Sequence, residues 1–407
     1  MGAVVLTWAV GATVTASRRH ATRAVGLDAE PLLFSAQDIF SSLAAADATA
    51  ANAFLAGGIE PADQRSAYLD DIQRASGGIA DASMKAGSSS GARAALTTLA
   101  QQLPVYTGLV EAARADNRQG LPAGAAFLRE ASSLMRKQLL PAAQALYETE
   151  ATQLSHEYGN SSEPLQTAAI ALIALLLLGA LVAPQLYLVK RTNRLLNLPL
   201  LLATLVTVGL LGWVLASFAG ERNDLASAKQ KGSNPVQVLS QARILALRAK
   251  GAESLSLVAR GSGQAFDADF TAFTTTLGVP GGSPGVLARA GSLATTDQSR
   301  QAVAAVDVAF AAYLAVHQKV AGLVASGQFD QAVSLAVGPR PDQVNAIFKQ
   351  LDNALAGALT LNQAEFAQQA ASARHQLDGL SVGIPIGLVV VGLLALAGLQ
   401  QRINDYR

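Results

Sequence analysis

The run LQTAAIALIALLLLGALVAPQLYLVKRTNRLLNLPLLLATLVTVGLLGWVLASFAG, residues 165–220, decides the fold of this chain. Residues 165–189 and residues 195–220 carry no charged side chain. Both reach the length of about 20 mostly apolar residues that a helix needs to cross a bilayer. The basic residues between them are Lys190, Arg191 and Arg194. The run therefore predicts two transmembrane helices joined by a short, basic loop, residues 190–194.

Two further apolar runs lie near the ends of the chain. LSVGIPIGLVVVGLLALAGL, residues 380–399, is as long as the central two, whereas GAVVLTWAVGATVTA, residues 2–16, is shorter and lacks the basic residues that open a secretory signal. We interpret residues 1–17 as a transmembrane helix that lacks a few upstream residues, because the start of the sequence is truncated. The alternative is a signal peptide that is cleaved after the small residues Val14–Ala16. The sequence thus predicts an all-α integral membrane protein with four transmembrane helices.

The short connections decide the predicted orientation, because long domains are translocated whatever their charge. The loop 190–194 is basic, and the tail 400–407 contains Arg402 and Arg407, so both are predicted to be cytoplasmic. Three basic residues after the first span argue against this orientation: Arg18, Arg19 and Arg23. We give the loop more weight, because it joins two unambiguous spans.

This orientation places residues 18–164 and 221–379 outside the cell, in a multi-pass protein of the plasma membrane. The two segments look like copies of one domain, since Glu30–Gly58 aligns with Asn234–Ser262 without a gap. The identical pairs include Pro31 and Pro235, Gln37 and Gln241, Leu43 and Leu247, and Gly57 and Gly261. Farther on, the interval from Tyr106 to Gly120 equals that from Tyr313 to Gly327. A matching order of features over a long period is typical of an internal repeat.

Each copy divides into four predicted helices, because glycine and proline end one helix and begin the next. In the first copy the breaks fall at Ala56–Pro61, Ala86–Gly91 and Arg118–Gly124. In the second copy they fall at Arg260–Gln264, Gly278–Gly285 and Ser326–Asp330, and a kink is expected at Val337–Asp342. Four long helices in sequence favour an up-down four-helix bundle for each extracytoplasmic segment.

The composition excludes several classes of function. Only 14% of the residues are charged and the net charge is +1, which argues against a nucleic-acid partner. The mean hydropathy of +0.30 is that of a chain with much apolar surface. There is no cysteine, so disulfides and thiolate sites are excluded.

No catalytic constellation is visible in the sequence. The four histidines lack the i, i+4 spacing of a helical metal site, and we expect them to be exposed: His20, His156, His317 and His375. We therefore expect no enzyme activity, no cofactor and no metal.

Asp47 is the most informative polar residue, because it lies on the apolar stripe of its predicted helix. A carboxylate in a bundle seam needs a partner. We expect a structural pair with Arg129 or Arg136, and contact with a ligand is the alternative. The remaining candidates for polar seam positions are Gln37 and Gln241. In the second copy, Arg248 and Lys250 play a similar role or face water.

The chain also resembles a known family. The residues that carry the resemblance are GLDAEPLLFSAQDIFSSLAAADATAANAFLAGG, residues 26–58, and YTGLVEAARADNRQGLPAGAAFLREASSLMRKQLLPAAQALYE, Tyr106–Glu148. With the four-span layout, they look like the actinobacterial GlnX-type membrane proteins, in which two extracytoplasmic helical domains resemble the four-helix sensor domains of chemoreceptors. That family works with a GlnH-type amino-acid-binding lipoprotein outside and the soluble serine/threonine protein kinase G inside. The resemblance implies that the lipoprotein senses amino acids such as glutamate or aspartate and that the membrane protein passes its state inward.

The predicted function is therefore a transmembrane signal relay that couples extracytoplasmic amino-acid sensing to a cytoplasmic serine/threonine kinase. Two other interpretations remain: an accessory subunit that docks a binding protein to an amino-acid permease, and a structural protein of the cell envelope. The expected partners are the solute-binding lipoprotein, the kinase and membrane lipid, and pairing into a homodimer is left open. So little of the chain is cytoplasmic that we expect the output surface to consist of Lys190, Arg191, Arg194, Arg402 and Arg407.

Overall fold

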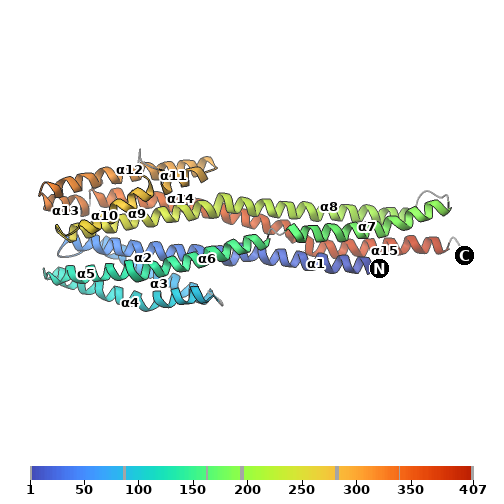
Figure 1. Ribbon diagram of the computed structural model, residues 1–407, viewed down its shortest axis with the longest axis horizontal. Helices are drawn as coiled ribbons and strands as arrows, with labels where there is room; N and C mark the ends of the chain where they lie inside the picture. Colours follow the sequence, from blue (N-terminus) through green and yellow to red (C-terminus); the bar gives the residue numbers. More distant parts are fainter. Residues whose placement is uncertain are drawn as a thin grey trace. The chain divides into compact units, whose positions relative to one another are not determined.

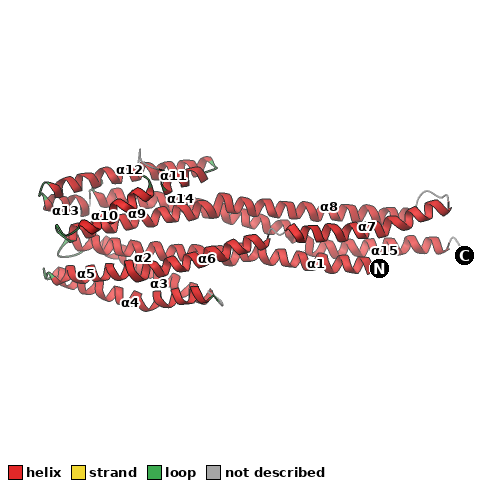
Figure 2. Ribbon diagram, in the orientation of Figure 1, coloured by secondary structure: helices red, strands yellow, loops and turns green. Residues whose placement is uncertain are grey.

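The computed structural model describes residues 2–85, 89–161, 164–192, 197–279, 284–338 and 340–404. Over these residues the regular structure is helical, without a strand (Figure 2), which confirms the predicted all-α class. The chain forms two compact units. The apolar unit consists of Met1–Ala29, Leu154–Ala228 and Ala367–Arg407, and the bundle unit consists of Glu30–Gln153 and Lys229–Phe366.

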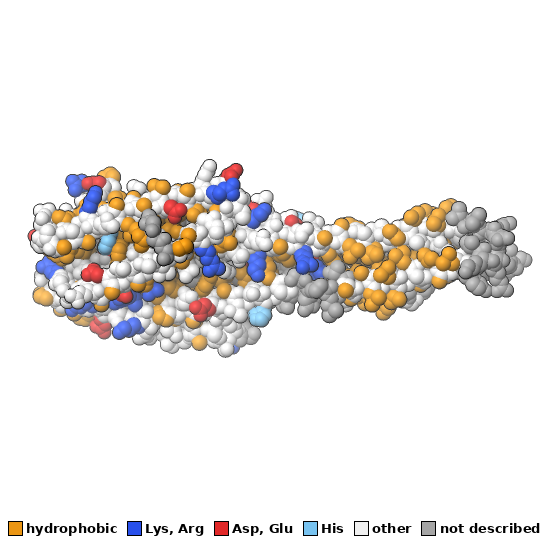
Figure 3. Space-filling model, turned by 45° about the horizontal axis from the view of Figure 1, so that its top comes forward, with side chains coloured by type: hydrophobic (Ala, Val, Ile, Leu, Met, Phe, Trp, Pro, Cys, Tyr) orange, Lys and Arg blue, Asp and Glu red, His pale blue; other side chains and the backbone are white. Residues whose placement is uncertain are grey.

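The predicted apolar runs form the long helices of the apolar unit (Figure 1). These are α1 (Gly2–Arg23), α7 (Pro164–Thr192), α8 (Leu198–Ser227) and α15 (Leu380–Asn404). Their shared core contains Leu177, Phe218 and Leu388. Large apolar side chains also cover the outside, such as Leu172, which is 60% exposed, and Figure 3 shows this surface almost free of charged side chains. Such a surface is unfavourable in water and favourable in lipid, as in a membrane protein.

Hydrogen bonds fix the relative directions of the helices within the apolar unit. Near the end of α7, the Gln185 amide donates to the Leu200 carbonyl and to Thr204 Oγ1 near the start of α8, both at 2.9 Å. At the start of α8, the Asn197 amide donates at 2.8 Å to the carbonyl of Gly398 near the end of α15. Helices α7 and α8 are therefore antiparallel, and so are α8 and α15.

Helix α15 packs closely against α8 because two of its residues have no side chain. A Cβ atom at Gly383 would lie 2.3 Å from the Trp213 ring, and one at Gly387 would lie 2.8 Å from a Leu210 methyl group. Small residues at such contacts let helix backbones approach each other in membrane proteins.

Within the described part of the chain, five helical stretches are long and apolar enough to cross a membrane, judged by length and composition alone. They are Val4–Ala56, Ala168–Leu186, Leu198–Val258, Asp297–Ala325 and Val344–Gln401. Asp297–Ala325, which is α12, was not among the predicted spans. It lies in the bundle unit and buries the stripe Val303, Val306, Phe310, Tyr313, Val316 and Val320. That spacing of three or four residues is typical of a helix with one face in a bundle core.

The first repeat has the predicted helical order. Its helices are α2 (Glu30–Ala56), α3 (Ala62–Lys85), α4 (Ser90–Arg118) and a fourth arm made of α5 (Ala123–Leu134), a π-helical turn η2 (Met135–Leu139) and α6 (Leu140–Ser161). The predicted break after α2 is confirmed, since Gly57 and Gly58 adopt φ of +67° and +56°, which favour glycine. Ser89 caps α4 by accepting a hydrogen bond from the backbone N–H of Ala92.

The second repeat is more broken than the sequence predicts. Its helices are α9 (Asn234–Val258), α10 (Gln264–Leu277), α11 (Val286–Leu293), α12 (Asp297–Ala325), α13 (Phe329–Val337) and α14 (Val344–Asp378). An unpredicted break precedes α12, whose cap Thr296 accepts from the N–H of Ser299. The kink predicted at Val337–Asp342 is wrong, because α13 ends there and α14 begins anew. The Gln343 amide stabilises this break by donating to the Ser334 carbonyl at 3.1 Å and accepting from Arg340 N–H at 2.8 Å.

The two repeats pack against each other through their first helices, α2 and α9. Buried residues of both helices, among them Ile39, Leu43, Leu239 and Leu247, belong to a single core in the bundle unit. Each fully buried side chain of this kind contributes about 1.5–3 kcal/mol relative to an exposed one. The heptad-like stripes of the two aligned segments therefore form one shared seam, which we call the α2–α9 seam.

Candidate functional site

Asp47 is buried in the first repeat, beside the α2–α9 seam, and its partners differ from those expected. Its Oδ1 atom accepts hydrogen bonds from Ser132 Oγ at 2.8 Å and from the Tyr106 hydroxyl at 3.4 Å. Burial raises the pKa of Asp47 to about 6, against the smaller effects of Ser132, Arg136 and Tyr106. Arg129 is exposed. The two arginines proposed as partners form no ion pair with Asp47, because helix α5 presents the hydroxyl of Ser132 instead.

Arg136 pairs with the second repeat. Its Nη1 atom lies 3.1 Å from Asp269 Oδ2 on α10, and its guanidinium lies over the Phe266 ring with 5.0 Å to the centroid. Its charge still lowers the pKa of Asp47 from a distance. Arg136 therefore connects the two repeats within the bundle unit.

The second repeat holds a buried carboxylate of its own, Glu253. Lys250 Nζ lies 3.0 Å from its Oε2 atom, and the Tyr313 hydroxyl donates to the same oxygen at 3.3 Å. His317 Nδ1 lies 2.7 Å from Oε1. Burial alone would raise the pKa of Glu253, but Lys250 and His317 overcome this effect and hold it at about 2.

Of the two alternatives for Lys250, the structural pair is confirmed, because Lys250 is buried and its Nζ lies 3.0 Å from Glu253. The expectation that all four histidines are exposed is wrong for His317. His317 is partly buried and stacks on the Phe270 ring at 3.6 Å, whereas His20, His156 and His375 are exposed as expected. The cause in both cases is Glu253, which needs cationic and hydrogen-bonding partners once α9 buries it.

Glu253 is not among the expected site residues, although the sequence contains a signal for it. The gapless alignment places Gly251 opposite Asp47, so the repeat pattern does not predict an acid at Glu253. The repeated tyrosines Tyr106 and Tyr313 mark the equivalent positions, since each donates its hydroxyl to a buried acid on the first helix of its own repeat.

Gln37 and Gln241 line the same cavity, on one side of the α2–α9 seam. The cavity has a volume of about 280 Å³ and is lined by α2, α6, α9 and α11. Gln37 is buried, and neither its Nε2 nor its Oε1 atom has a hydrogen-bond partner among the described residues. Gln241 is exposed at the edge of the cavity. We call this space the amide cavity.

A second cavity, of about 390 Å³, lies on the other side of the seam, where α2, α3, α9 and α14 meet. Its lining is charged with both signs, and several of the charges are already paired. Arg243 Nε lies 2.7 Å from Asp352 Oδ1, and Arg74 pairs with Asp71. Burial raises the pKa of Asp71 to about 6, against the opposing effect of Arg74. We call this space the ion-pair cavity.

Helix α2 begins with a buried carboxylate. Glu30 accepts a hydrogen bond from Ser233 Oγ at 2.9 Å, and burial raises its pKa to about 7 against the smaller effect of Ser233. The chain passes between the apolar unit and the bundle unit beside these two residues, and π-helical turns lie there, η1 (Ala24–Ala29) and η3 (Ala228–Ser233). Single π-helical turns inside α-helices occur frequently at functional sites.

A buried ion pair joins α1 and α8 within the apolar unit. Arg18 Nη1 lies 2.8 Å from Glu221 Oε2, Thr22 Oγ1 donates to Glu221 Oε1 at 2.7 Å, and the guanidinium lies 4.2 Å from the centroid of Phe218. Arg19 lies 3.3 Å from Asp378. Two of the three arginines that argue against the predicted orientation are thus paired with carboxylates.

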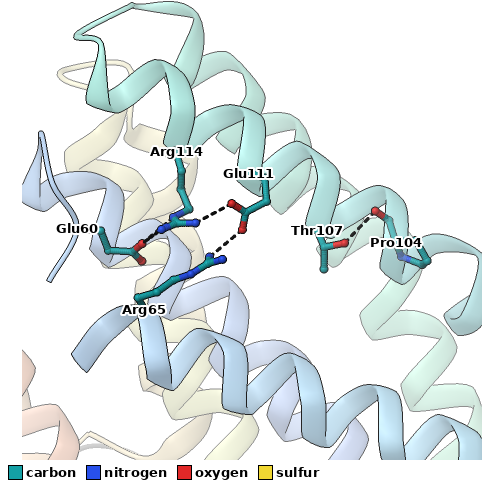
Figure 4. Close-up of polar contacts among 6 residues, drawn as sticks. All are labelled: Glu60, Arg65, Pro104, Thr107, Glu111 and Arg114. Atoms are coloured by element: carbon teal, nitrogen blue, oxygen red, sulfur yellow. Dashed lines mark hydrogen bonds and ion pairs between the residues drawn. The ribbon is translucent and has the colours of Figure 1, made fainter. Parts of the chain in front are cut away.

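A further group of ion pairs lies where α3 begins and α4 nears its end (Figure 4). Arg114 bridges Glu60 at 2.5 Å and Glu111 at 2.7 Å, and Glu111 also accepts from Arg65 at 2.7 Å. Thr107 donates to the carbonyl of Pro104, the proline inside α4, at 2.9 Å. A network of this kind stabilises a helix connection, and nothing in it suggests a ligand.

The proposed output residues lie outside the described residues. This holds for Arg194 and Arg407 entirely and for the side chains of Lys190, Arg191 and Arg402. Among the described residues, no group of three or more histidine, aspartate or glutamate side chains is placed to hold a metal ion.

One comparison with known proteins gives a match. Residues 21–159 match the family model described as the actinobacterial sensor domain. The matched region is roughly a third of the chain and covers the first repeat with Gln37, Asp47, Tyr106 and Ser132. The curated proteins and the solved structures gave no match. Together with the long apolar helices, the match supports an actinobacterial sensor protein of the membrane.

Proposed function

We propose that the protein is a four-span membrane relay that carries an extracytoplasmic signal to the cytoplasm. The observation that carries the proposal is the match of residues 21–159 to a sensor domain, combined with one helical stretch that continues through the π-helical turn Ala24–Ala29. That stretch, Val4–Ala56, runs from the apolar N-terminal segment into the matched region.

Two other helical stretches also run from one unit into the other along the chain, Leu198–Val258 and Val344–Gln401. Helices α2 and α9, which form the seam, are the bundle portions of Val4–Ala56 and Leu198–Val258. A ligand or ligand-loaded partner that favours one packing of α2 against α9 shifts the population toward it. Small shifts of whole helices are a common way to transmit such a change.

The proposed topology keeps both repeats outside and the loop 190–194 inside. Arg18 and Glu221 follow the apolar segments of α1 and α8, and Asp378 precedes that of α15. Their ion pairs bring these three ends to one level of the apolar unit. This alternation supports four spans, with α12 as a bundle helix.

The proposed partners are those implied by the GlnX-type resemblance: an amino-acid-binding lipoprotein outside and a serine/threonine kinase inside. The proposed output consists of the loop and tail residues Lys190, Arg191, Arg194, Arg402 and Arg407. The protein acts in this proposal without enzyme activity, cofactor or metal of its own.

The topology can be tested directly, because the natural chain has no cysteine. Single cysteines at Met84 and Ser326, both exposed, are expected to react with an impermeant maleimide in right-side-out vesicles. A cysteine at Asn193 is expected to react only after permeabilisation. Labelling of Asn193→Cys in sealed vesicles would contradict the proposed orientation.

The relay is tested in a deletion strain by following kinase-substrate phosphorylation with and without added amino acid. We expect that added amino acid no longer changes kinase-substrate phosphorylation in the deletion strain. Expression of the natural chain is expected to restore this change. An unchanged response would overturn the relay, and lost amino-acid uptake with intact phosphorylation would assign the protein to a permease instead. Crosslinking in membranes, followed by identification of captured proteins, tests whether a binding lipoprotein and a kinase are neighbours.

A further inference from the structure

The amide cavity has the composition of a binding site for an anion. Its charged lining residues are Arg248 and Arg289, and no carboxylate of the described part of the chain lines it. Its neutral polar lining residues are Gln37, Gln144, Tyr147, Gln237, Ser240 and Gln241. Phe40 and Ile244 supply apolar walls. Two guanidinium groups with amides and hydroxyls around them match the oxygens of a carboxylate ligand.

Gln37 is the strongest sign that this cavity is made for a ligand. The residue is only 6% exposed, and both polar atoms of its side chain are without a hydrogen-bond partner among the described residues. Burial raises the pKa of the Tyr147 hydroxyl and the Gln37 amide beside it lowers that pKa, so the hydroxyl reaches at most one of the two polar atoms of Gln37. Buried amides are nearly always paired, so an unpaired one facing a cavity indicates a missing partner.

Arg248 is also incompletely paired. Its Nε atom is buried without a partner, and its guanidinium lies 4.3 Å from the centroid of the Phe273 ring. Burial lowers the pKa of Arg248, and the nearby carboxylate of Asp269 opposes this effect. That carboxylate already forms an ion pair with Arg136. Arg248, which lines the amide cavity, therefore has one buried donor, Nε, that the described residues leave without a partner.

The ion-pair cavity is a useful contrast. Both cavities are lined by α2 and α9, the first helices of the two repeats. The amide cavity adds α6 and α11, and the ion-pair cavity adds α3 and α14. There, however, Arg243 and Arg74 are already paired with Asp352 and Asp71. Four aspartates also line the ion-pair cavity and disfavour an anion there: Asp63, Asp70, Asp71 and Asp352. In the amide cavity, among the described residues, an anion would meet no lining carboxylate.

We propose that the amide cavity binds a small organic anion with two carboxylate groups, which deepens the proposed function and rests on it for its signalling role. One carboxylate pairs with Arg248 and the other with Arg289, while Gln37 donates from Nε2. The ligand contacts both α2 and α9, so its binding favours one packing of the two helices that run into the apolar segments. A dicarboxylate with an ammonium group also satisfies the acceptor Oε1 of Gln37.

Binding is measured on the full chain in lipid nanodiscs, by calorimetry and thermal unfolding. The probes are succinate, glutamate and the uncharged succinamide, at matched ionic strength. We expect a saturable rise of Tm with succinate or glutamate and none with succinamide. Binding of succinate and glutamate alike assigns the site to dicarboxylates in general, and preference for glutamate assigns it to those with an ammonium group. Absence of saturable binding for both anions overturns the proposal.

Three variants locate the site. Arg289→Gln and Gln37→Leu are each expected to weaken binding about tenfold or more, since each removes a partner of a charged group. Arg118→Gln, an exposed arginine on α4 outside the cavity, is the matched control and should bind like the natural chain. Gln37→Leu without ligand should keep its Tm, because it removes an unsatisfied amide. Unchanged affinity in both Arg289→Gln and Gln37→Leu overturns the location.

The same variants separate this proposal from the relay. Dicarboxylate binding in nanodiscs without any kinase response in cells would overturn the relay and leave the binding site standing. A kinase response that persists in Arg289→Gln and Gln37→Leu cells, together with absent binding, would overturn the site and leave the relay standing.

Discussion

Arg18 and Glu221 form an ion pair of 2.8 Å in which the side chains are 3% and 0% exposed. They come from α1 and α8, far apart in the sequence, and Thr22 and Phe218 complete their surroundings. A buried pair is costly to desolvate, but removing one member is worse, because it leaves an uncompensated charge.

We therefore expect Arg18→Ala to destabilise the apolar unit by about 3–5 kcal/mol. The double variant Arg18→Leu/Glu221→Leu should recover most of that loss, because apolar residues replace both charges. Arg19→Ala, which removes the more exposed pair with Asp378, is the control and should cost about 1 kcal/mol or less. Chaotrope unfolding in nanodiscs measures all three. Equal losses for Arg18→Ala and Arg19→Ala would contradict the argument.

Asp47 gives a pH-dependent prediction. Its pKa is raised from 3.8 to about 6 in the folded protein, mainly by burial. The folded state therefore favours the protonated form, and the stability from this group is present below about pH 4 and lost as the pH rises through 6. Asp47→Asn mimics the protonated form, so its advantage over the natural chain should grow between pH 4 and 7. A shift of two pKa units corresponds to about 3 kcal/mol as an upper bound.

The measurement is Tm against pH for the natural chain and Asp47→Asn. The Ser132→Ala variant, which removes one of the hydrogen bonds to Asp47, should raise the pKa further and steepen the pH dependence. A constant difference between the natural chain and Asp47→Asn from pH 4 to 7 would show that the carboxyl group titrates as in water.

Glu253 predicts the opposite trend. Its pKa is held at about 2, below the ordinary 4.5, because Lys250 and His317 outweigh burial. The stability that it contributes is present above pH 4.5 and is lost as the pH falls toward 2. Glu253→Gln leaves Lys250 buried without its charge partner, so we expect a loss of about 3–5 kcal/mol at pH 7.

Comparison of Glu253→Gln with the double variant Glu253→Gln/Lys250→Met tests this explanation. The double variant should be more stable than the single one, since the unpaired ammonium group is gone. The deficit of Glu253→Gln should shrink as the pH falls from 4.5. Persistence of the full deficit at pH 3 would mean that packing, and not charge, is the cause.

The sequence was sufficient for the features that depend on neighbouring residues. Uninterrupted apolar runs predicted α7, α8 and α15, and Gly57 and Gly58 predicted the end of α2, because both signals act within one or two turns. The break before α12 was missed although Thr296 is a common capping residue, because no glycine or proline marks it. The Val337–Asp342 break depends on hydrogen bonds of the Gln343 side chain, which a pattern of prolines does not reveal.

The candidate site was predicted only in part, for a related physical reason. Asp47 and Gln37 could be found, since a polar residue on an apolar stripe is a local anomaly. Their partners could not, because which helix faces Asp47 depends on packing between residues 85 positions apart. The amide cavity arises only when α2 meets α9, so the unpaired state of Gln37 is invisible in the sequence.

The loop 190–194 provides the final prediction, because its charges have two separable roles. Charge alone sets the orientation of the hairpin. Recognition by a kinase would also depend on whether each position holds lysine or arginine, since arginine binds carboxylates in a bidentate manner and lysine does not. The exchange Lys190→Arg/Arg191→Lys/Arg194→Lys keeps the charge, so we expect normal labelling of a cysteine at Asn193 but a reduced kinase response. The neutral triple variant with glutamine should disturb both. If the charge-conserving exchange and the neutral variant both signal normally with correct insertion, these residues are not the output surface.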